Sequence, residues 1–507
     1  MNNISKEKTI LALISEIYIF VIIILFPIMV DKTGFFHILE CKWNYFVIIS
    51  TTYISLSIIV FLYYLIVKKA NYLRHIKFSM VQWTAIAFLL VNILSCFTSP
   101  FFRSYNLFIG VGRGEGLIVM SLYILTFLFV SIFATFKKRH ILYFSISSII
   151  LNLIAVLQYI GFNPFNMYQD GIGTHNVSFM TTIGNIDFIS AMYCILLAVS
   201  LSSFIFLEDS KCNKIIHLLS IYLGFFILGI IDVTSGKVAF LSILVLFFPY
   251  IVKNNKRLAR FIIIIATILM AYCSNIMLNP EYHYDISKLG IYFQFNYITL
   301  LFILVCLILI LLAKKLYSTY YSIDNKKIIK SFYLSIGVLM LLGILVLYFV
   351  NFKSGMLYEM HELLHGNFDD DFGTYRIFLW KRTFKLVYQF PILGSGPDSF
   401  AIRFMARYTS DIASIGPLTI NDTAANVYFT MLINLGIVGL FTYLSFIFFQ
   451  LKEGIKNMNN YSKILFITLI CYLIQDFFNL SVVIVSPLFW LLMGLHYRSL
   501  KECVEII

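Results

Sequence analysis

Residues 427–450 read VYFTMLINLGIVGLFTYLSFIFFQ, a run of 24 residues without a charged side chain. Because an α-helix of about 20 apolar residues spans the hydrocarbon core of a bilayer, this stretch is predicted to cross a membrane. Similar runs elsewhere predict an all-α integral membrane protein, a polytopic bundle of about fourteen transmembrane helices. The other expected spans lie near 9–30, 45–67, 78–97, 116–136, 141–161, 186–207, 215–232, 237–252, 258–277, 293–313, 331–351, 464–480 and 482–497, the last two as a tight helical hairpin.

The composition supports a chain that is solvated mostly by lipid. Charged residues make up only 12% of the 507 residues, and hydrophobic residues make up 60%. A soluble domain carries about a quarter charged residues, so this chain cannot cover a water-exposed surface of its size. The formal net charge of +13 does not indicate a nucleic-acid-binding protein, because Lys and Arg occur in short clusters between apolar runs. We therefore expect membrane lipids around the chain and no nucleic-acid partner.

The loop charges predict the orientation in the membrane. With the N-terminus inside, the cytoplasmic segments hold 25 of the 38 Lys and Arg residues, as the positive-inside rule requires. We therefore expect a multi-pass protein of the inner (plasma) membrane with both termini in the cytoplasm. The chain then divides into eleven transmembrane helices in 1–351, a large extracytoplasmic loop in 352–426, and three helices with a short tail in 427–507.

The large loop contains a basic amphipathic pattern over 373–389 that predicts a helix. Thr374 is the predicted N-cap, and Pro391 disfavours helical geometry at the residue before it. Arg376 would lie in the first turn, where a cation and free backbone N–H groups together bind an anion well. The alternative is a helix lying on lipid headgroups. The expected apolar stripe consists of Ile377, Trp380, Phe384, Val387 and Tyr388.

Two shorter outer segments each carry a cation between small residues. Arg113 stands in the glycine frame 112–116, and Lys237 stands in the turn 234–237 between the seventh and eighth spans. The alternative for each is an interfacial cation whose stem is buried and whose head reaches water. Ionisable residues inside apolar runs are costly and therefore either paired or functional. Four acidic residues are of this kind: Glu16, Asp187, Asp232 and Asp476.

A metal site has only weak support. The large loop holds His361, His365 and the acidic run 369–371, and carboxylates suit hard cations. A solvated acidic turn explains the same residues more simply. The sequence contains no HExxH motif, Walker loop or Ser-His-Asp order. We therefore expect no metal site.

Taken in order, these motifs resemble the O-antigen ligase/O-antigen polymerase family of bacterial membrane glycosyltransferases. The resemblance extends from about residue 100 onward, and its stretches at 182–185 and 391–400 are most similar to the Gram-positive-type branch. The motifs that carry it are GRGEG at 112–116, TIGN at 182–185, TSGK at 234–237, Arg376 with Trp380, PILGSGPDSF at 391–400, Asn426 with Tyr428, GIVGL at 436–440 and PLFW at 487–490.

The resemblance implies a reaction. A glycan carried on undecaprenyl diphosphate moves to a hydroxyl of a glycan or lipid acceptor during cell-surface polysaccharide biosynthesis, and the lipid diphosphate leaves without a metal or other cofactor. By resemblance, Arg376 and Lys237 are catalytic cations. Lys237 stands where the family usually has arginine, so the charge is kept but the bidentate fork is lost. Substrate-binding roles are expected for Arg113, Arg382, Asn426 and Asp398.

One departure from the family pattern concerns the general base. The family typically has a histidine directly before the asparagine that matches Asn426, and this chain has Ala425 there. Alanine cannot accept a proton, and general-base catalysis contributes typically about 10²–10⁴-fold. Asp422 is the nearest carboxylate in the sequence and is our predicted base. The alternatives are Asp398, His361 and His365.

Two other functions are compatible with a polytopic chain. A polysaccharide flippase or transporter should show related halves, and the sequence shows no internal repeat. A catalytically impaired family member that only binds lipid-linked glycan is suggested by Ala425. The transferase explains the large charged outer loop best. The acceptor, and therefore the choice between polymerase and ligase, cannot be read from the motifs, although the Gram-positive-type stretches favour polymerisation.

Overall fold

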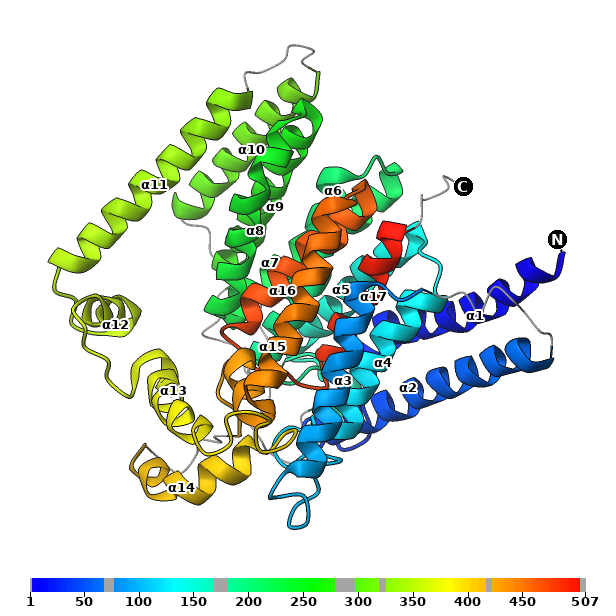
Figure 1. Ribbon diagram of the computed structural model, residues 1–507. Coiled ribbons are helices and arrows are strands. Elements are labelled where there is room, and N and C mark those ends of the chain that lie inside the picture. Colours follow the sequence, from blue (N-terminus) through cyan, green and yellow to red (C-terminus); the bar gives the residue numbers. More distant parts are fainter. Residues whose placement is uncertain are drawn as a thin grey trace.

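The structure is a computed structural model that describes residues 2–67, 77–167, 180–278, 297–318, 325–415 and 422–501. These residues fold into seventeen α-helices (Figure 1). The helices are α1 (Asn2–Phe20), α2 (Ile38–Leu62), α3 (Met80–Thr98), α4 (Leu117–Phe133), α5 (Lys138–Tyr159), α6 (Ile186–Phe206), α7 (Lys211–Ile231), α8 (Thr234–Val252), α9 (Asn255–Met277), α10 (Tyr297–Ser318), α11 (Asn325–Phe349), α12 (Gly355–Leu364), α13 (Phe372–Val387), α14 (Phe400–Ile415), α15 (Val427–Lys456), α16 (Asn460–Asp476) and α17 (Ser486–Lys501).

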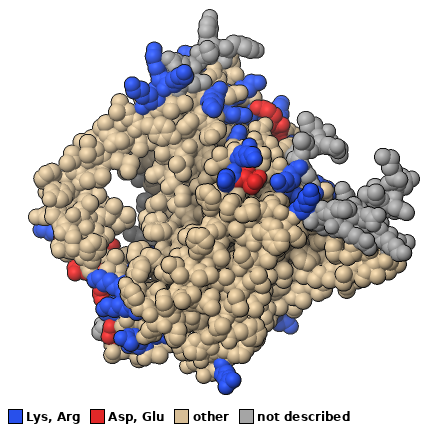
Figure 2. Space-filling model, in the orientation of Figure 1, with Lys and Arg blue, Asp and Glu red and all other residues tan. Residues whose placement is uncertain are grey.

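Eleven helical segments within the described ranges are long and apolar enough to cross a membrane. They confirm an all-helical polytopic membrane protein. The three remaining expected spans correspond to α4 with 17 residues, α16 with 17 residues and α17 with 16 residues, which are shorter than the usual span of about 20 residues. The count of fourteen therefore stays a prediction. On the face drawn in Figure 2, charged side chains gather towards opposite ends of the bundle, with a broad uncharged band between them.

Helix α6 is the centre of the bundle. Its most apolar 18-residue window is 100% buried, whereas the corresponding window of α11 is 0% buried. α6 packs against α5, α7, α8 and α16, while the main neighbours of α11 are α8 and α12. A helix that is apolar on every side is buried on every side, in the interior of a large protein or in a membrane. The first turn of α6 therefore lies within a ring of neighbouring helices.

The long helix α15 changes direction at Gly436. The residue has a φ of +67°, and a Cβ atom there would lie 2.2 Å from the carbonyl oxygen of Ile392. Only glycine tolerates both conditions. The backbone groups freed by the kink pair with the segment 391–396, for example Ile437 N–H with the Pro391 carbonyl at 2.8 Å. The predicted motifs at 391–400 and 436–440 are thus two halves of one packing unit.

The predicted hairpin of the last two spans is wrong in its connection. Helices α16 and α17 pack against each other, but nine residues, 477–485, join them. The connection is apolar, and its residues Val482 to Val485 are buried without being helical. Hydropathy alone does not distinguish a buried connection from a helix. The two predicted spans therefore have the observed lengths, but each is shifted by four residues towards the connection.

The start of α13 also differs from the prediction. Gly373, Thr374 and Tyr375 have φ values of +63°, +55° and +65°, so Thr374 is not the N-cap. Regular helical geometry begins at Arg376. The predicted apolar stripe is wrong in part, because Tyr388 is 83% exposed. The side chains that α13 buries against α14 and α15 are Phe378, Leu379, Thr383 and Leu386.

Candidate functional site

The glycine-rich turn at 110–116 closes around a carboxylate from a distant segment. Gly110 has a φ of +103°, and a Cβ atom there would lie 2.3 Å from Oδ2 of Asp398. A Cβ atom at Gly112 would lie 2.9 Å from Oδ1 of the same residue. Glycine is therefore required at both positions because a side chain would prevent Asp398 from approaching the backbone. The glycine frame singled out in the sequence is closed around Asp398.

Asp398 is held by backbone N–H groups of this turn. Its carboxylate accepts hydrogen bonds from the amides of Gly112 at 3.0 Å, Arg113 at 3.0 Å and Glu115 at 3.2 Å. The residue is only 6% exposed. Burial raises the pKa of Asp398 to about 7, although the three N–H donors act in the opposite direction. Asp398 thus fixes the backbone that carries Arg113.

Arg113 projects from the turn and is paired with Asp422. Its Nε lies 2.6 Å from Oδ2 of Asp422, and the two side chains are 24% and 13% exposed. Its guanidinium carbon lies 5.7 Å from the centre of the Phe188 ring. Burial raises the pKa of Asp422, and the neighbouring Arg113 charge partly offsets this. Residues 113 and 422 were both predicted as site residues, and the structure brings them into direct contact.

Glu115 is a site residue that the sequence analysis did not single out. Its Oε1 accepts hydrogen bonds from the Tyr123 hydroxyl at 2.9 Å and the Ser481 hydroxyl at 2.8 Å. Burial, with a contribution from the charge of Asp398, raises the pKa of Glu115 to about 7. One signal was available in the sequence, because Glu115 is the single acidic residue inside the glycine frame.

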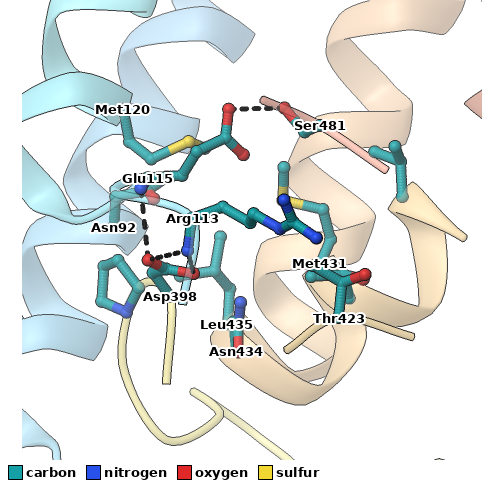
Figure 3. Close-up of a pocket in the computed structure, with 13 residues that line it drawn as sticks. Asn92, Arg113, Glu115, Met120, Asp398, Thr423, Met431, Asn434, Leu435 and Ser481 are labelled. Atoms are coloured by element: carbon teal, nitrogen blue, oxygen red, sulfur yellow. Dashed lines mark hydrogen bonds between the residues drawn. The ribbon is translucent and has the colours of Figure 1, made fainter. Parts of the chain in front are cut away.

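Arg113, Glu115 and Asp398 line one small pocket, and Asp422 adjoins it through its ion pair with Arg113. Figure 3 shows the Arg113 side chain extending across it towards Met431 and Thr423. The wall combines charged groups with thioether and aliphatic side chains, which is typical of ligand sites. The lining residues come from α3, the 112–116 turn, α4, the 391–399 segment, α15 and the 477–485 connection.

Arg376 and Asn426 are both anchored to the connection between α16 and α17. Arg376 donates from Nη2 to the Phe478 carbonyl at 3.0 Å. Asn426 donates from Nδ2 to the adjacent Phe477 carbonyl at 2.8 Å. Asn426 also caps α15 by accepting from the Phe429 amide at 3.0 Å. Two predicted site residues thus meet at adjacent carbonyls of a connection that the sequence had assigned to helices.

The N-terminus of α6 lies between Arg113 and Arg376. Asn185 caps the helix by accepting from the Asp187 amide at 2.8 Å. Arg113 faces the ring of Phe188, and Arg376 lies close enough to Asp187 for their charges to interact. A helix N-terminus carries a partial positive charge and free N–H groups. Two arginines, each with an acidic neighbour, thus approach this helix end, and cations at a helix N-terminus can act together on an anion.

Lys237 lies outside the pocket lining. The expected turn 234–237 is the first turn of α8, and Lys237 forms an ion pair with Asp232. Among the described residues, no hydrogen bond or ion pair joins Lys237 to Arg113 or Arg376. α8 still approaches α6 closely, because a Cβ atom at Gly236 would lie 2.3 Å from Oγ of Ser190.

Arg382 is held within the loop region. It donates from Nη1 to Asp370 at 2.7 Å and from Nε to Asp411 at 2.9 Å, and its guanidinium carbon lies 3.6 Å from the centre of the Phe378 ring. It does not line the pocket around Arg113.

The two loop histidines contact backbone carbonyls. His361 pairs through Nδ1 with the Leu347 carbonyl at 2.7 Å, and His365 pairs with the His361 carbonyl at 2.8 Å. Within the described ranges, no group of three or more His, Cys, Asp or Glu side chains is arranged to hold a metal ion.

Arg403 is a buried cation that the sequence analysis missed. It is 4% exposed and donates to the Ser395 hydroxyl at 3.2 Å and to Oε1 of Gln389 at 3.0 Å. It also donates to the Leu386 carbonyl near the end of α13. Arg403 therefore ties α13 to the segment that carries Asp398.

The comparison with known families identifies one region of the chain. Residues 294–444 match the family model described as O-antigen ligase. The sequence matches none of the curated proteins with which it was compared. The matched region includes Arg376, Asp398, Asp422 and Asn426, while Arg113 and Glu115 lie before it. The chain is thus a polytopic membrane protein in which one region, residues 294–444, matches the O-antigen ligase family model.

Proposed function

We propose that this protein is a membrane glycosyltransferase that moves a glycan from a lipid diphosphate to an acceptor hydroxyl in cell-surface polysaccharide biosynthesis. The match of residues 294–444 to the O-antigen ligase family supports this class of reaction. The observation that carries it for this chain is the contact between the family region and the distant 112–116 turn, where Arg113 pairs with Asp422 beside the buried Asp398.

The proposed reaction places negative charge on the leaving group. The acceptor oxygen forms a bond to the anomeric carbon of the glycan, and the bond from that carbon to the diphosphate oxygen breaks. The electron pair of the broken bond stays on the diphosphate. Fixed cations near that oxygen lower the barrier, because they interact more strongly with the transition state than with the donor. Arg113, Arg376 and the N-terminus of α6 supply this field.

The remaining predicted residues take supporting roles. Lys237 adds positive charge from the edge of α8, where it is 36% exposed. Asp398 and Asn426 hold the backbone around the substrate. Arg382 contributes to glycan binding from the loop region. The proton of the acceptor hydroxyl passes to a carboxylate, for which Asp422 is the residue that the sequence favours.

The proposed partners follow from the reaction. The donor is an undecaprenyl-diphosphate-linked glycan, and the acceptor is a glycan or a lipid anchor. No metal or other cofactor is required, because guanidinium groups supply the charge. With both termini in the cytoplasm, the pocket opens on the outer face of the plasma membrane, where the donor is presented after it has crossed the bilayer.

The test is reconstitution of the purified protein in liposomes with a lipid-diphosphate-linked oligosaccharide. We expect wild-type protein to produce transferred glycan and released lipid diphosphate in equal amounts. Arg407→Ala is the matched control, because Arg407 is an exposed cation of α14 outside the pocket, and it should keep activity. Passage of intact donor across the bilayer without cleavage would instead establish a transporter. Binding of donor without either event would establish a non-catalytic lipid-linked glycan-binding protein.

A further inference from the structure

Three carboxyl groups surround Arg113: Glu115 and Asp398 line the pocket with it, and Asp422 is its ion-pair partner. Two of the three already have defined partners. Asp398 receives three backbone N–H groups. Asp422 is paired with the Arg113 guanidinium at 2.6 Å. A proton on either carboxyl group would compete with these partners, although burial holds the pKa of both groups above its ordinary value. Neither group is therefore well placed to take a proton during a reaction.

Glu115 has a different arrangement. Both of its side-chain hydrogen bonds, from Tyr123 and Ser481, end on Oε1. The hydroxyl of Ser486, which pairs with the Ser481 hydroxyl at 2.8 Å, is a further hydrogen-bonding neighbour of the carboxyl group. The residue lines the pocket together with Arg113, and Figure 3 shows one carboxylate oxygen bonded to Ser481 and the other turned towards the Arg113 side. One oxygen is thus fixed by two hydrogen bonds, and the other faces the pocket.

We propose that Glu115 is the general base that accepts the proton of the acceptor hydroxyl in this chain. The proposal rests on the proposed transferase function and names the group that replaces the histidine absent at Ala425. Oε2 takes the hydroxyl proton as the acceptor oxygen bonds to the anomeric carbon. The diphosphate leaves with the electron pair of the broken carbon–oxygen bond. Glu115 then returns its proton to water.

The electrostatic environment suits this role. Burial raises the pKa of Glu115 to about 7, and a base is most effective when its pKa lies near the working pH. Below about pH 7 the carboxyl is protonated and cannot accept, so the rate should fall as the pH falls through this value. The titratable and charged groups that face Glu115 from the surrounding elements are Arg113, Tyr123, Asp398, Tyr443, Tyr472 and Asp476.

Asp422 takes a positioning role under this proposal. It fixes the Arg113 guanidinium between the pocket and the Phe188 ring. Loss of the Asp422 charge should therefore lower the rate at every pH, but the rate should still rise with pH as Glu115 loses its proton. The pH profile separates the two carboxylates, which a single activity measurement would not.

The experiment uses full-length protein in liposomes with the lipid-diphosphate-linked oligosaccharide and measures released lipid diphosphate. Glu115→Gln keeps an oxygen for the Tyr123 and Ser481 hydrogen bonds but cannot act as a base. We expect kcat to fall about 10²–10⁴-fold with little change in the donor KM, and we expect the rise in rate through pH 7 to disappear. Asp422→Asn should keep that rise.

A second variant guards against a purely structural explanation. Glu115→Ala leaves space beside Arg113, and added formate should restore part of the rate by acting as a small external base. Melting temperature and donor binding of each variant report its folding. Wild-type-like activity of Glu115→Gln, or a Glu115→Ala protein that binds donor but is not rescued by formate, would overturn the proposal. Absence of transfer by the wild-type protein would instead contradict the proposed function itself.

Discussion

Two short turns of this molecule carry one cation each between small residues, yet their surroundings differ. Arg113 in the 112–116 turn is 24% exposed and lies against Asp422 and the Phe188 ring. Lys237 at the start of α8 is 36% exposed, and its partner Asp232 is 80% exposed. Charges act more strongly where water is excluded, and exposed ion pairs contribute little. The two motifs look alike in sequence, but only the first is built into a pocket.

The largest expected difference is in activity. Arg113→Ala should lower kcat/KM for glycan transfer by about 10²–10³-fold, because it removes a fixed charge at the leaving group. It also leaves the buried Asp422 without its partner. The measurement is lipid-diphosphate release from the reconstituted protein, with Arg407→Ala as the control. A loss of less than about threefold would place Arg113 outside the chemistry.

Asp398 contacts the 112–116 turn and Asp232 contacts Lys237, and the loss of these two carboxylates should differ in its effect on stability. Asp398→Ala leaves three buried N–H groups without an acceptor and should lower the free energy of unfolding by about 3 kcal/mol. Asp398→Asn keeps one oxygen for these donors and should cost less. Asp232→Asn changes a residue that is mostly exposed and should stay within about 0.5 kcal/mol. Unfolding in detergent measures all three, and equal losses for Asp398→Ala and Asp232→Asn would remove the distinction between the turns.

The glycines sharpen the same contrast. Gly110→Ala places a Cβ atom on a residue with φ of +103° and against both Asp398 and the backbone of Gly116, so we expect a loss of about 2–3 kcal/mol. Gly236→Ala meets the Ser190 hydroxyl, which can rotate away, and should cost about 1 kcal/mol or less. Thermal unfolding of the two variants in parallel gives the comparison. A larger loss of stability for Gly236→Ala than for Gly110→Ala would mean that the 110–116 turn accommodates a side chain more easily than its contacts indicate.

The smallest expected effect belongs to Lys237. Lys237→Ala should lower kcat/KM by less than about tenfold, and the loss should shrink at high salt because exposed charges are screened. Lys237→Arg restores the residue that the family usually has at this position and should match or exceed the wild-type rate. Assays at low and high ionic strength check both statements. A loss as large as that of Arg113→Ala would show that the two turns are equivalent.

The sequence predicted the helical membrane bundle because apolar runs of about 20 residues are a local signal. Contacts between distant segments have no such local signal in the sequence. Arg113 and Asp422 are far apart in the chain, and no periodicity indicates that they pair. The sequence predicts helix for most of the 477–485 connection, because its valines and isoleucine are as apolar as a span although they form a buried turn. The role of Glu115 is not evident from the sequence, because its burial, which raises its basicity, depends on packing against α4 and the distant 477–485 connection.

The central claim is that Arg113 and Arg376, at the N-terminus of α6, hold a lipid diphosphate. Direct measurement of undecaprenyl diphosphate binding to the purified protein tests it, with wild type, Arg376→Ala and the control Arg407→Ala compared at one ionic strength. The account predicts that Arg376→Ala weakens binding at least about tenfold, since hydrogen bonds to charged groups contribute about 1.5–3 kcal/mol, and that Arg407→Ala binds like wild type. Equal affinity in all three proteins would contradict it.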